Sequence, residues 1–200
     1  MSNILRIKRS LISVSDKGKI VPFAKDLAKE DIEIISTGNT FKELKKNKIN
    51  VKKIEEVTSF PEILSGRVKT LHPKIFGGIL ANKLDQSHAR QLKQHSIPEI
   101  QLVVVNLYPF KETIRISNNI NKCIENIDIG GPSLIRAAAK NFLSTAIITD
   151  KDDYKKVITE IKKLLPTTHC INVLTRYSLS ASLRSDIHGG GWVACLFFFV

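Results

Sequence analysis

Short apolar runs alternate along the chain with longer segments whose apolar residues recur at helical spacing. Such runs of four or so residues, bounded by polar or turn residues, predict buried strands at 11–14, 32–35, 51–54, 102–105 and 146–148. Apolar residues on a 3.6-residue period predict helices at 20–28, 40–48 and 151–165. A further helix is expected around 132–139, because Pro132 is well suited to the first turn of a helix.

This alternation of strand and helix predicts an α/β fold. Strands separated by helices favour a mostly parallel central sheet covered by helices on both faces, which is a three-layer sandwich. The 200 residues suffice for one domain of ordinary size. In open parallel sheets ligands bind beyond the carboxyl ends of the strands. Candidate chemistry is therefore expected just after the predicted strands.

The composition adds a strong basic excess to this picture. Lys and Arg number 31 against 19 Asp and Glu, a formal charge of +12. The excess could attract a phosphorylated metabolite, or it could be a solvated lysine-rich surface. Most of the basic residues are scattered lysines with few aromatic residues between them, whereas nucleic-acid sites favour Arg and stacking aromatics. The solvated surface is favoured, and no nucleic-acid partner is expected.

The cysteines and the chain ends bear on cellular location. Cys123, Cys170 and Cys195 lack metal-ligand spacing, and a sparse, odd number of cysteines suits a reducing cytoplasm rather than a secreted disulfide scaffold. No signal peptide precedes Lys8, and the apolar residues 192–200 are too few to span a bilayer. We expect a cytoplasmic protein with no metal site and no membrane partner.

Two segments after the first two strands could bind phosphate. The sequence SVSDKG at 13–18 combines hydroxyls and a lysine with a helix start, and STGNT at 36–40 places a glycine and hydroxyls before the next helix. Free amides at a helix start bind anions. The alternative for both segments is ordinary helix capping by short polar side chains. The two segments support each other, since both would face one end of the sheet.

Three further segments carry candidate side chains. In GRVKTLHPK at 66–74, alternation along an extended segment would place Arg67 and Lys69 on one side, with a solvated basic loop as the alternative. His72 could shuttle protons, although a structural loop role is favoured. In NLYPF at 106–110, Asn106 and Tyr108 could bind a planar heterocycle, or the segment could be a turn with Phe110 in the core.

The last segment, IDIGGPS at 127–133 followed by RAAAKN at 136–141, combines an aspartate, two glycines and a helix start. These supply a carboxylate and backbone donors for proton transfer and for a developing oxyanion. The alternative is a helix entry capped by Asp128. A helix from Pro132 would carry Lys140 about 12 Å along its axis. Asp128 and Lys140 would then meet only if the glycine turn folds back or a substrate bridges them.

Taken in order, SVSDKG, STGNT, GRVKTLHPK, VVVNLYPF, IDIGGP and RAAAKN resemble the IMP cyclohydrolase domain of the bifunctional purine-biosynthesis enzymes, which also carry an AICAR transformylase domain. The resemblance runs from about Leu11 to Leu165. It implies the methylglyoxal-synthase-like sandwich fold. It also implies closure of the formylated aminoimidazole carboxamide ribonucleotide (FAICAR) to inosine monophosphate (IMP), without metal or other cofactor, in a homodimer if the domain is complete.

The resemblance also assigns roles to individual residues. It places the phosphate and ribose contacts at Ser13, Ser15, Lys17, Thr37, Gly38, Thr40, Lys69 and Thr70. It places the surroundings of the reacting base at Arg67, Lys69, Asn106, Tyr108, Asp128 and Lys140, with Asp128 and Lys140 as the proton-transfer pair.

The sequence departs from the family pattern at two places. Asn39 stands where the family usually has a second glycine, and we expect Asn to tolerate a positive φ there with some loss. Residues 167–200 match nothing in the family pattern, so we expect a domain at 1–166, an aberrant or unstructured tail at 167–200, and no transformylase activity. The alternatives are a non-catalytic phosphometabolite-binding module of the same fold, which would not need both Asp128 and Lys140, and methylglyoxal synthase, which lacks the Tyr108 and Asp128 motifs.

Overall fold

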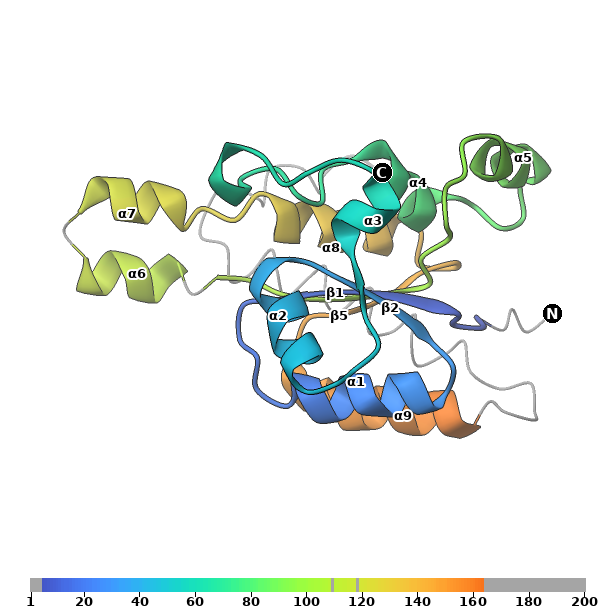
Figure 1. Ribbon diagram of the computed structural model, residues 1–200, viewed down its shortest axis with the longest axis horizontal. Helices are drawn as coiled ribbons and strands as arrows, with labels where there is room; N and C mark the ends of the chain where they lie inside the picture. Colours follow the sequence, from blue (N-terminus) through green and yellow to red (C-terminus); the bar gives the residue numbers. More distant parts are fainter. Residues whose placement is uncertain (1–4, 109, 118, 164–200) are drawn as a thin grey trace, which may run out of the picture.

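A five-stranded, wholly parallel sheet forms the centre of the molecule (Figure 1). The computed structural model describes residues 5–108, 110–117 and 119–163. In chain order the strands are β1 (Arg9–Val14), β2 (Glu33–Ser36), β3 (Lys52–Lys53), β4 (Leu102–Asn106) and β5 (Ala146–Ile148). Their order across the sheet is β3-β2-β1-β4-β5. The predicted α/β architecture with a parallel sheet is confirmed.

The strand order reverses direction between β1 and β4. Here Leu11 pairs with both Ile35 of β2 and Val103 of β4, and the carboxyl end of β1 at Val14 lies beside Asn106. The connections that leave β1 and β4 therefore run to opposite sides of the sheet and leave a crevice beyond the strand ends, the usual ligand position in open α/β sheets.

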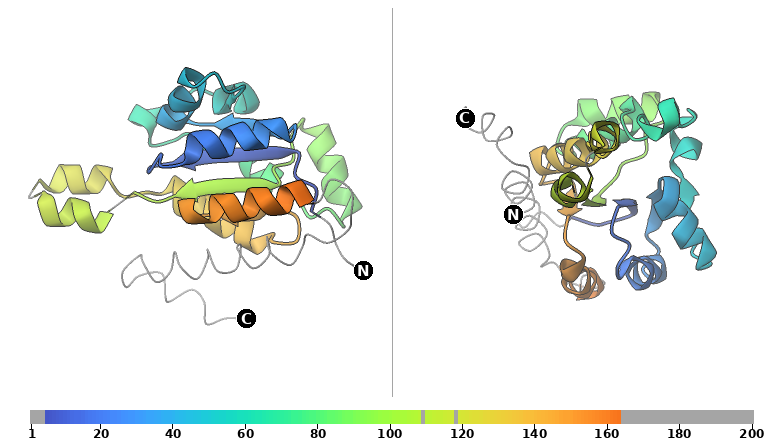
Figure 2. Two further views of the ribbon diagram at one scale, coloured as in Figure 1. Left: turned by 90° about the horizontal axis from the view of Figure 1, so that it is seen from below. Right: turned by 90° about the vertical axis from the view of Figure 1, so that its left-hand side faces the viewer.

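Helices cover both faces of the sheet, as the views in Figures 1 and 2 show. One face packs on α1 (Ile20–Lys29), α2 (Gly38–Lys46) and α9 (Tyr154–Lys163), and Phe23 stacks on Tyr154 at 4.5 Å. The other packs on α3 (Ile54–Thr58), α4 (Pro73–Leu80) and α8 (Gly130–Lys140). Central strands are buried on both sides, which explains why β4 reads as an unbroken apolar run.

Three further helices lie outside these two layers. Helix α5 (Gln86–Gln94) runs along the surface and buries no residue. Helices α6 (Phe110–Ile116) and α7 (Ile120–Glu125) form a hairpin that projects beyond the carboxyl ends of the strands (Figure 2). Two short 3₁₀ helices, η1 (Leu64–Gly66) and η2 (Lys151–Asp153), complete the described chain.

Two predicted elements differ from the structure in their bounds. The strand predicted at 51–54 is only Lys52–Lys53, because Ile54 already begins α3 and turns its side chain into the core. The helix predicted at 151–165 begins as η2 and continues as α9, with the side chain of Asp150 accepting a hydrogen bond from the amide of Asp152. The predicted tail at 167–200 lies outside the described residues.

Candidate functional site

A cavity of about 530 Å³ opens beyond the carboxyl ends of β1 and β4. Its walls come from the loop after β1, the start of α2, the η1 loop, the end of β4, the end of α7 and the start of α8. Every residue to which the resemblance assigns a role, except Lys140, lines it: Ser13, Ser15, Lys17, Thr37, Gly38, Thr40, Arg67, Lys69, Thr70, Asn106, Tyr108 and Asp128. The fold therefore gathers residues separated by more than a hundred positions into one site.

The wall formed by β1 and α2 is rich in hydroxyls and helix amides. Ser13 Oγ and Thr37 Oγ1 lie 3.0 Å apart, and the Thr37 side chain makes no capping bond to α2. Helix α2 begins at Gly38, so the first-turn amides of α2 have no partner within the helix and border the cavity. Gly38 has φ of +46°, a conformation that favours glycine. This wall suits a phosphate group.

Two side chains predicted to contact the substrate, those of Thr40 and Asn106, form hydrogen bonds to the protein backbone at this wall. The Thr40 hydroxyl is buried, accepts from the Val14 amide at 3.2 Å and donates to the Val14 carbonyl at 3.0 Å. The Asn106 Oδ1 atom accepts from the amides of Ser15 at 2.6 Å and Asp16 at 2.9 Å, while its Nδ2 donates to the Asp16 carbonyl at 2.9 Å. Asn106 thus fixes the loop after β1, and its amide group is turned to that loop.

The loop after β1 is also held by Lys151, which lies in the segment that follows β5. Lys151 Nζ lies 2.6 Å from Asp16 Oδ2, and this hydrogen bond, together with one from the Gly18 amide, holds the pKa of Asp16 below its usual range. The Lys17 ammonium donates to the Ser15 carbonyl at 3.3 Å. A lysine outside every motif, Lys151, therefore supports the first phosphate-type segment.

The basic segment begins in a tight turn with positive φ at Leu64, Ser65 and Gly66, so the extended conformation predicted for it is wrong. Residues Leu64–Gly66 form η1, and Arg67 has φ of −68° and ψ of −26°. Arg67 and Lys69 nevertheless both line the cavity. Arg67 is ion-paired with Glu125 at the end of α7, and Lys69 Nζ lies 3.4 Å from Glu62 Oε1. The turn, and not strand alternation, brings the two cations to one side.

The segment before α8 supplies the half-buried carboxylate of the site. Asp128 Oδ1 accepts from the Gly131 amide at 2.8 Å, so the capping interpretation holds as a structural contact. Burial nevertheless raises the pKa of Asp128, and the amides of Gly131 and Tyr108 only partly offset this by hydrogen bonding to the carboxylate. A carboxyl group with a raised pKa beside a helix start is suited to proton transfer. Tyr108 is about half exposed, at 51%, and faces the same cavity.

The structure does not bring Lys140 to Asp128. Asp128 precedes α8, whereas Lys140 is the last residue of that eleven-residue helix and is exposed. A helix rises about 1.5 Å per residue, so the two side chains stand at opposite ends of α8. The glycine turn does not fold back, so Asp128 and Lys140 do not meet within the chain, and their role as a proton-transfer pair stays a prediction. Asn141, beside it, donates to the carbonyls of Ile79 and Ala81 and so ties α8 to the end of α4.

Three smaller expectations are also settled by the geometry. His72 is the N-cap of α4 and its Nδ1 accepts from the Lys74 amide at 3.1 Å, which confirms the structural loop role. The positive φ lies at Gly38 and not at Asn39, which sits inside α2, so no left-handed asparagine is needed. Phe110 is 38% exposed, so the alternative that buried it in the core is wrong.

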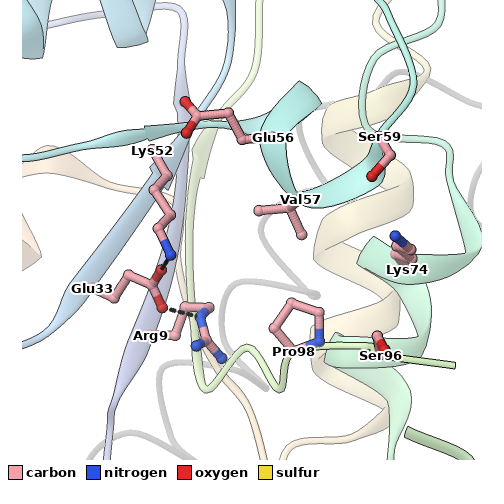
Figure 3. Close-up of a pocket in the computed structure, with 9 residues that line it drawn as sticks. All are labelled: Arg9, Glu33, Lys52, Glu56, Val57, Ser59, Lys74, Ser96 and Pro98. Carbon is pink, nitrogen blue, oxygen red and sulfur yellow. Dashed lines mark hydrogen bonds and ion pairs between the residues drawn. The ribbon is translucent and has the colours of Figure 1, made fainter. Parts of the chain in front are cut away.

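A second cavity, of about 440 Å³, lies at the amino ends of β1 and β2 (Figure 3). The Glu33 carboxylate there is shared by Arg9 and Lys52, each at 2.5 Å, as the dashed lines in Figure 3 show. Burial alone would raise the pKa of Glu33, but the hydrogen bonds from Lys52 and Arg9 outweigh it and keep that pKa below its usual range. Arg9 and Lys52 are thus both paired with the same carboxylate.

Within residues 5–108, 110–117 and 119–163, no cluster of three or more His, Cys, Asp or Glu side chains could hold a metal ion. No helix in the same part of the chain is long and apolar enough to cross a bilayer.

Comparison with known proteins places this geometry in a family. The family model described as the MGS-like domain matches residues 19–133, which is more than half of the chain. A solved structure titled "Crystal structure of ForH" superposes with a TM-score of 0.78 and 30% identity, covering 90% of this chain and 93% of that one.

Curated relatives carry longer chains. The bifunctional purine biosynthesis protein PurH of Thermoanaerobacter sp. (strain X514) is 57% identical over 157 residues, covering 78% of this chain and 31% of its own length. PurH of Clostridioides difficile (strain 630) is 54% identical over 179 residues, 90% of this chain and 35% of its own. That match is longer than residues 1–165, so the similarity continues past Leu165, where the motif-based resemblance ended.

The chain spans about a third of the length of these relatives. The family model covers residues 19–133, and the TM-score of 0.78 to the solved structure shows that the two chains share the fold. The chain therefore belongs to the MGS-like domain family, and its curated relatives are the bifunctional PurH proteins.

Proposed function

We propose that this domain is an IMP cyclohydrolase of purine biosynthesis, which closes FAICAR to IMP. The observation that carries the proposal is the single cavity in which a phosphate-type wall faces a half-buried aspartate at the start of α8. The names of the relatives, bifunctional purine biosynthesis proteins, support the substrate class.

The reaction requires little beyond positioning and proton movement. The carboxamide nitrogen of the substrate attacks the formyl carbon, a new carbon–nitrogen bond forms, and the formyl oxygen departs as water with one hydrogen from each nitrogen. Fixing the two groups in a reactive geometry can contribute about 7–11 kcal/mol to such an intramolecular closure. No electron leaves the substrate, so the proposed reaction needs no redox partner.

The cavity offers a place for each end of the substrate. The 5′-phosphate would bind the amides at the start of α2 with the hydroxyls of Ser13 and Thr37, and Lys69 would supply a positive charge beside them. The base would then lie toward Tyr108 and Asp128 on the opposite wall. The positive end of the α8 dipole would stabilise the oxyanion of the tetrahedral intermediate.

Asp128 would carry the proton. Its raised pKa brings the carboxyl group nearer to the pH at which it can both accept a proton from the attacking nitrogen and return it to the departing oxygen. Because Lys140 stands at the far end of α8, the proposed chemistry within one chain rests on Asp128 without it.

A non-catalytic phosphometabolite-binding module is the second candidate. The absence of Lys140 from the cavity favours it, since such a module needs the phosphate wall alone. The two candidates differ in turnover: both would bind IMP, and only the enzyme would convert FAICAR.

The test is a spectrophotometric assay of IMP formation from FAICAR, with and without a chelator. We expect turnover that the chelator leaves unchanged. IMP binding without turnover would favour the module, and turnover abolished by the chelator would contradict the metal-free mechanism.

We also propose a homodimer. The exposed side chains of Ile116 (81%) and Ile120 (70%) on the projecting hairpin support it, and light scattering would test it.

A further inference from the structure

Two of the three cations that line the cavity, Arg67 and Lys69, are each paired with a carboxylate that no motif singled out. Arg67 pairs with Glu125, and Lys69 pairs with Glu62. The side chains of the first pair are 62% and 57% exposed, and those of the second are 30% and 35% exposed. Exposed ion pairs contribute little because water screens them, so the Glu62–Lys69 pair is the one with more influence on its lysine.

The Glu62–Lys69 pair passes directly over Gly66. A Cβ atom at Gly66 would lie 2.6 Å from Glu62 Oε1, 2.7 Å from Lys69 Cε and 2.8 Å from Lys69 Nζ, which is closer than real Cβ contacts allow. Gly66 also has φ of +89°, a conformation that side chains rarely adopt. The backbone of the basic turn is therefore shaped so that this carboxylate can reach this ammonium.

On the side away from Glu62, the Lys69 ammonium faces the phosphate-type wall. A Cβ atom built on Gly38 would lie 3.4 Å from Lys69 Nζ, so the ammonium sits over the first residue of α2. The Lys69 ammonium thus lies between the Glu62 carboxylate and the helix start proposed to bind the 5′-phosphate. A lysine ammonium carries three donors and can serve a carboxylate and a phosphate together.

We infer that Glu62 is a positioning residue that holds the Lys69 ammonium at the start of α2, ready for the phosphate of the nucleotide. A free lysine side chain loses rotamer entropy when it is fixed in one position. With Glu62 present, part of that ordering is complete before the nucleotide arrives, and affinity rises accordingly. The inference deepens the proposed function and rests on it.

The experiment measures IMP affinity by calorimetry and FAICAR kinetics on the full 200-residue chain. Glu62→Gln is expected to weaken IMP binding and raise KM by about fivefold, the upper range for an ion pair of this exposure, while kcat stays within about twofold. Glu62→Asp, which keeps the charge, should recover part of the affinity. In Lys69→Ala, adding Glu62→Gln should cause no further loss, because the residue that Glu62 positions is gone.

Glu55→Gln is the matched control. It removes a Lys–Glu pair of similar kind, with Lys53 at 2.9 Å, outside the cavity, and should leave IMP affinity unchanged. Thermal unfolding of each variant separates loss of fold from loss of positioning. Positioning is overturned if Glu62→Gln binds IMP like the parent, if its effect adds fully to that of Lys69→Ala, or if Glu55→Gln weakens binding equally.

A second measurement needs no nucleotide. The rate at which an amine-reactive reagent acylates Lys69 can be followed by mass spectrometry. Acylation should be faster in Glu62→Gln than in the parent, because the Lys69 side chain is no longer held by Glu62. An equal rate would overturn the positioning role of Glu62. A parent chain that binds no IMP would overturn the proposed function, and the positioning role with it, whereas a parent that binds IMP as well as Glu62→Gln does would overturn the positioning role alone.

Discussion

The two ends of the central sheet hold cavities of comparable size but opposite chemistry. At the amino ends of β1 and β2, the charges of Arg9, Glu33 and Lys52 satisfy one another (Figure 3). At the carboxyl ends, hydroxyls, helix amides and a half-buried aspartate face open space. In a parallel sheet, the helix that follows a strand starts near the carboxyl end of that strand. Free amide donors and the positive ends of the helix dipoles therefore collect at that end of the sheet.

The two carboxylates at these ends illustrate the same difference. Burial by itself favours a higher pKa for both carboxyl groups. At Glu33 the hydrogen bonds from Lys52 and Arg9 outweigh burial and lower the pKa, whereas at Asp128 the amides of Gly131 and Tyr108 do not, and the pKa is raised. Glu33 is therefore stabilised as an anion and is suited to a structural role. Asp128 is held in a state that binds its proton more tightly, which suits proton transfer.

The largest expected contrast is between Asp128→Asn and Glu33→Gln in the cyclohydrolase assay. Asp128→Asn should lower kcat by about 10²- to 10⁴-fold, the usual contribution of a general acid–base group. Glu33→Gln should leave kcat unchanged, because it lies at the other end of the sheet. Steady-state kinetics on folded variants, checked by circular dichroism, decide it. A normal kcat for Asp128→Asn would remove this residue from the mechanism.

The next contrast is between two lysines that line the two cavities. Lys69→Ala should raise KM by about 10- to 100-fold, as expected for loss of a charged hydrogen bond made in both ground and transition states. Lys74→Ala, at the amino-end cavity, should leave KM unchanged. Initial rates over a range of FAICAR concentrations provide the measurement. Equal effects of the two substitutions would mean that the net positive charge, and not the cavity, attracts the substrate.

A smaller effect is expected on stability. Glu33→Gln removes an acceptor shared by Arg9 and Lys52, and loss of a partly exposed pair costs up to about 1 kcal/mol. This corresponds to a fall in Tm of about 2–4 °C for a chain of this size. Asp128→Asn should lower Tm less, because Asn can still accept the hydrogen bond of the Gly131 amide. Differential scanning calorimetry at neutral pH measures both changes in Tm. A larger fall in Tm for Asp128→Asn than for Glu33→Gln would contradict the structural role assigned to Glu33.

The smallest effect is a difference of sign in the pH dependence of stability. The folded pKa of Glu33 is lowered, so its contribution is present above the unfolded value of 4.5 and is lost as the pH falls through the folded pKa. The folded pKa of Asp128 is raised, so the folded state binds the proton more tightly and stability falls as the pH rises from 3.8 through the folded pKa.

Urea unfolding of the parent, Glu33→Gln and Asp128→Asn between pH 3 and 7 measures these two contributions separately. The stability difference between parent and Glu33→Gln should shrink on acidification. The difference between parent and Asp128→Asn should move in favour of the parent over the same change. Two differences that move in the same direction would contradict the burial argument for Asp128.

The pattern of apolar residues predicted most of the layered core. Strands β1, β2, β4 and β5 are short buried apolar runs, and helices α1, α2 and α9 each carry an apolar stripe. Helix α8 was expected from Pro132, and α4, which buries Ile75 and Ile79, was not predicted. Helices α5 and α7 bury no residue, so no apolar period marks them. The two-residue β3 is too short for its pattern to separate it from the helix that begins at Ile54.

The motifs likewise indicated which residues line the cavity. Those after β1, β2 and β4 follow strands, and parallel strands end together, whereas the basic turn and the start of α8 reach the same cavity through packing. Only the tertiary structure decided their partners. The turn at Gly66, the pairing of Lys69 with Glu62 and of Arg67 with Glu125, and the separation of Lys140 from Asp128 all depend on distances across the fold. A sequence orders residues along one dimension, whereas ion pairs and cavities are set by how helices and loops pack in three.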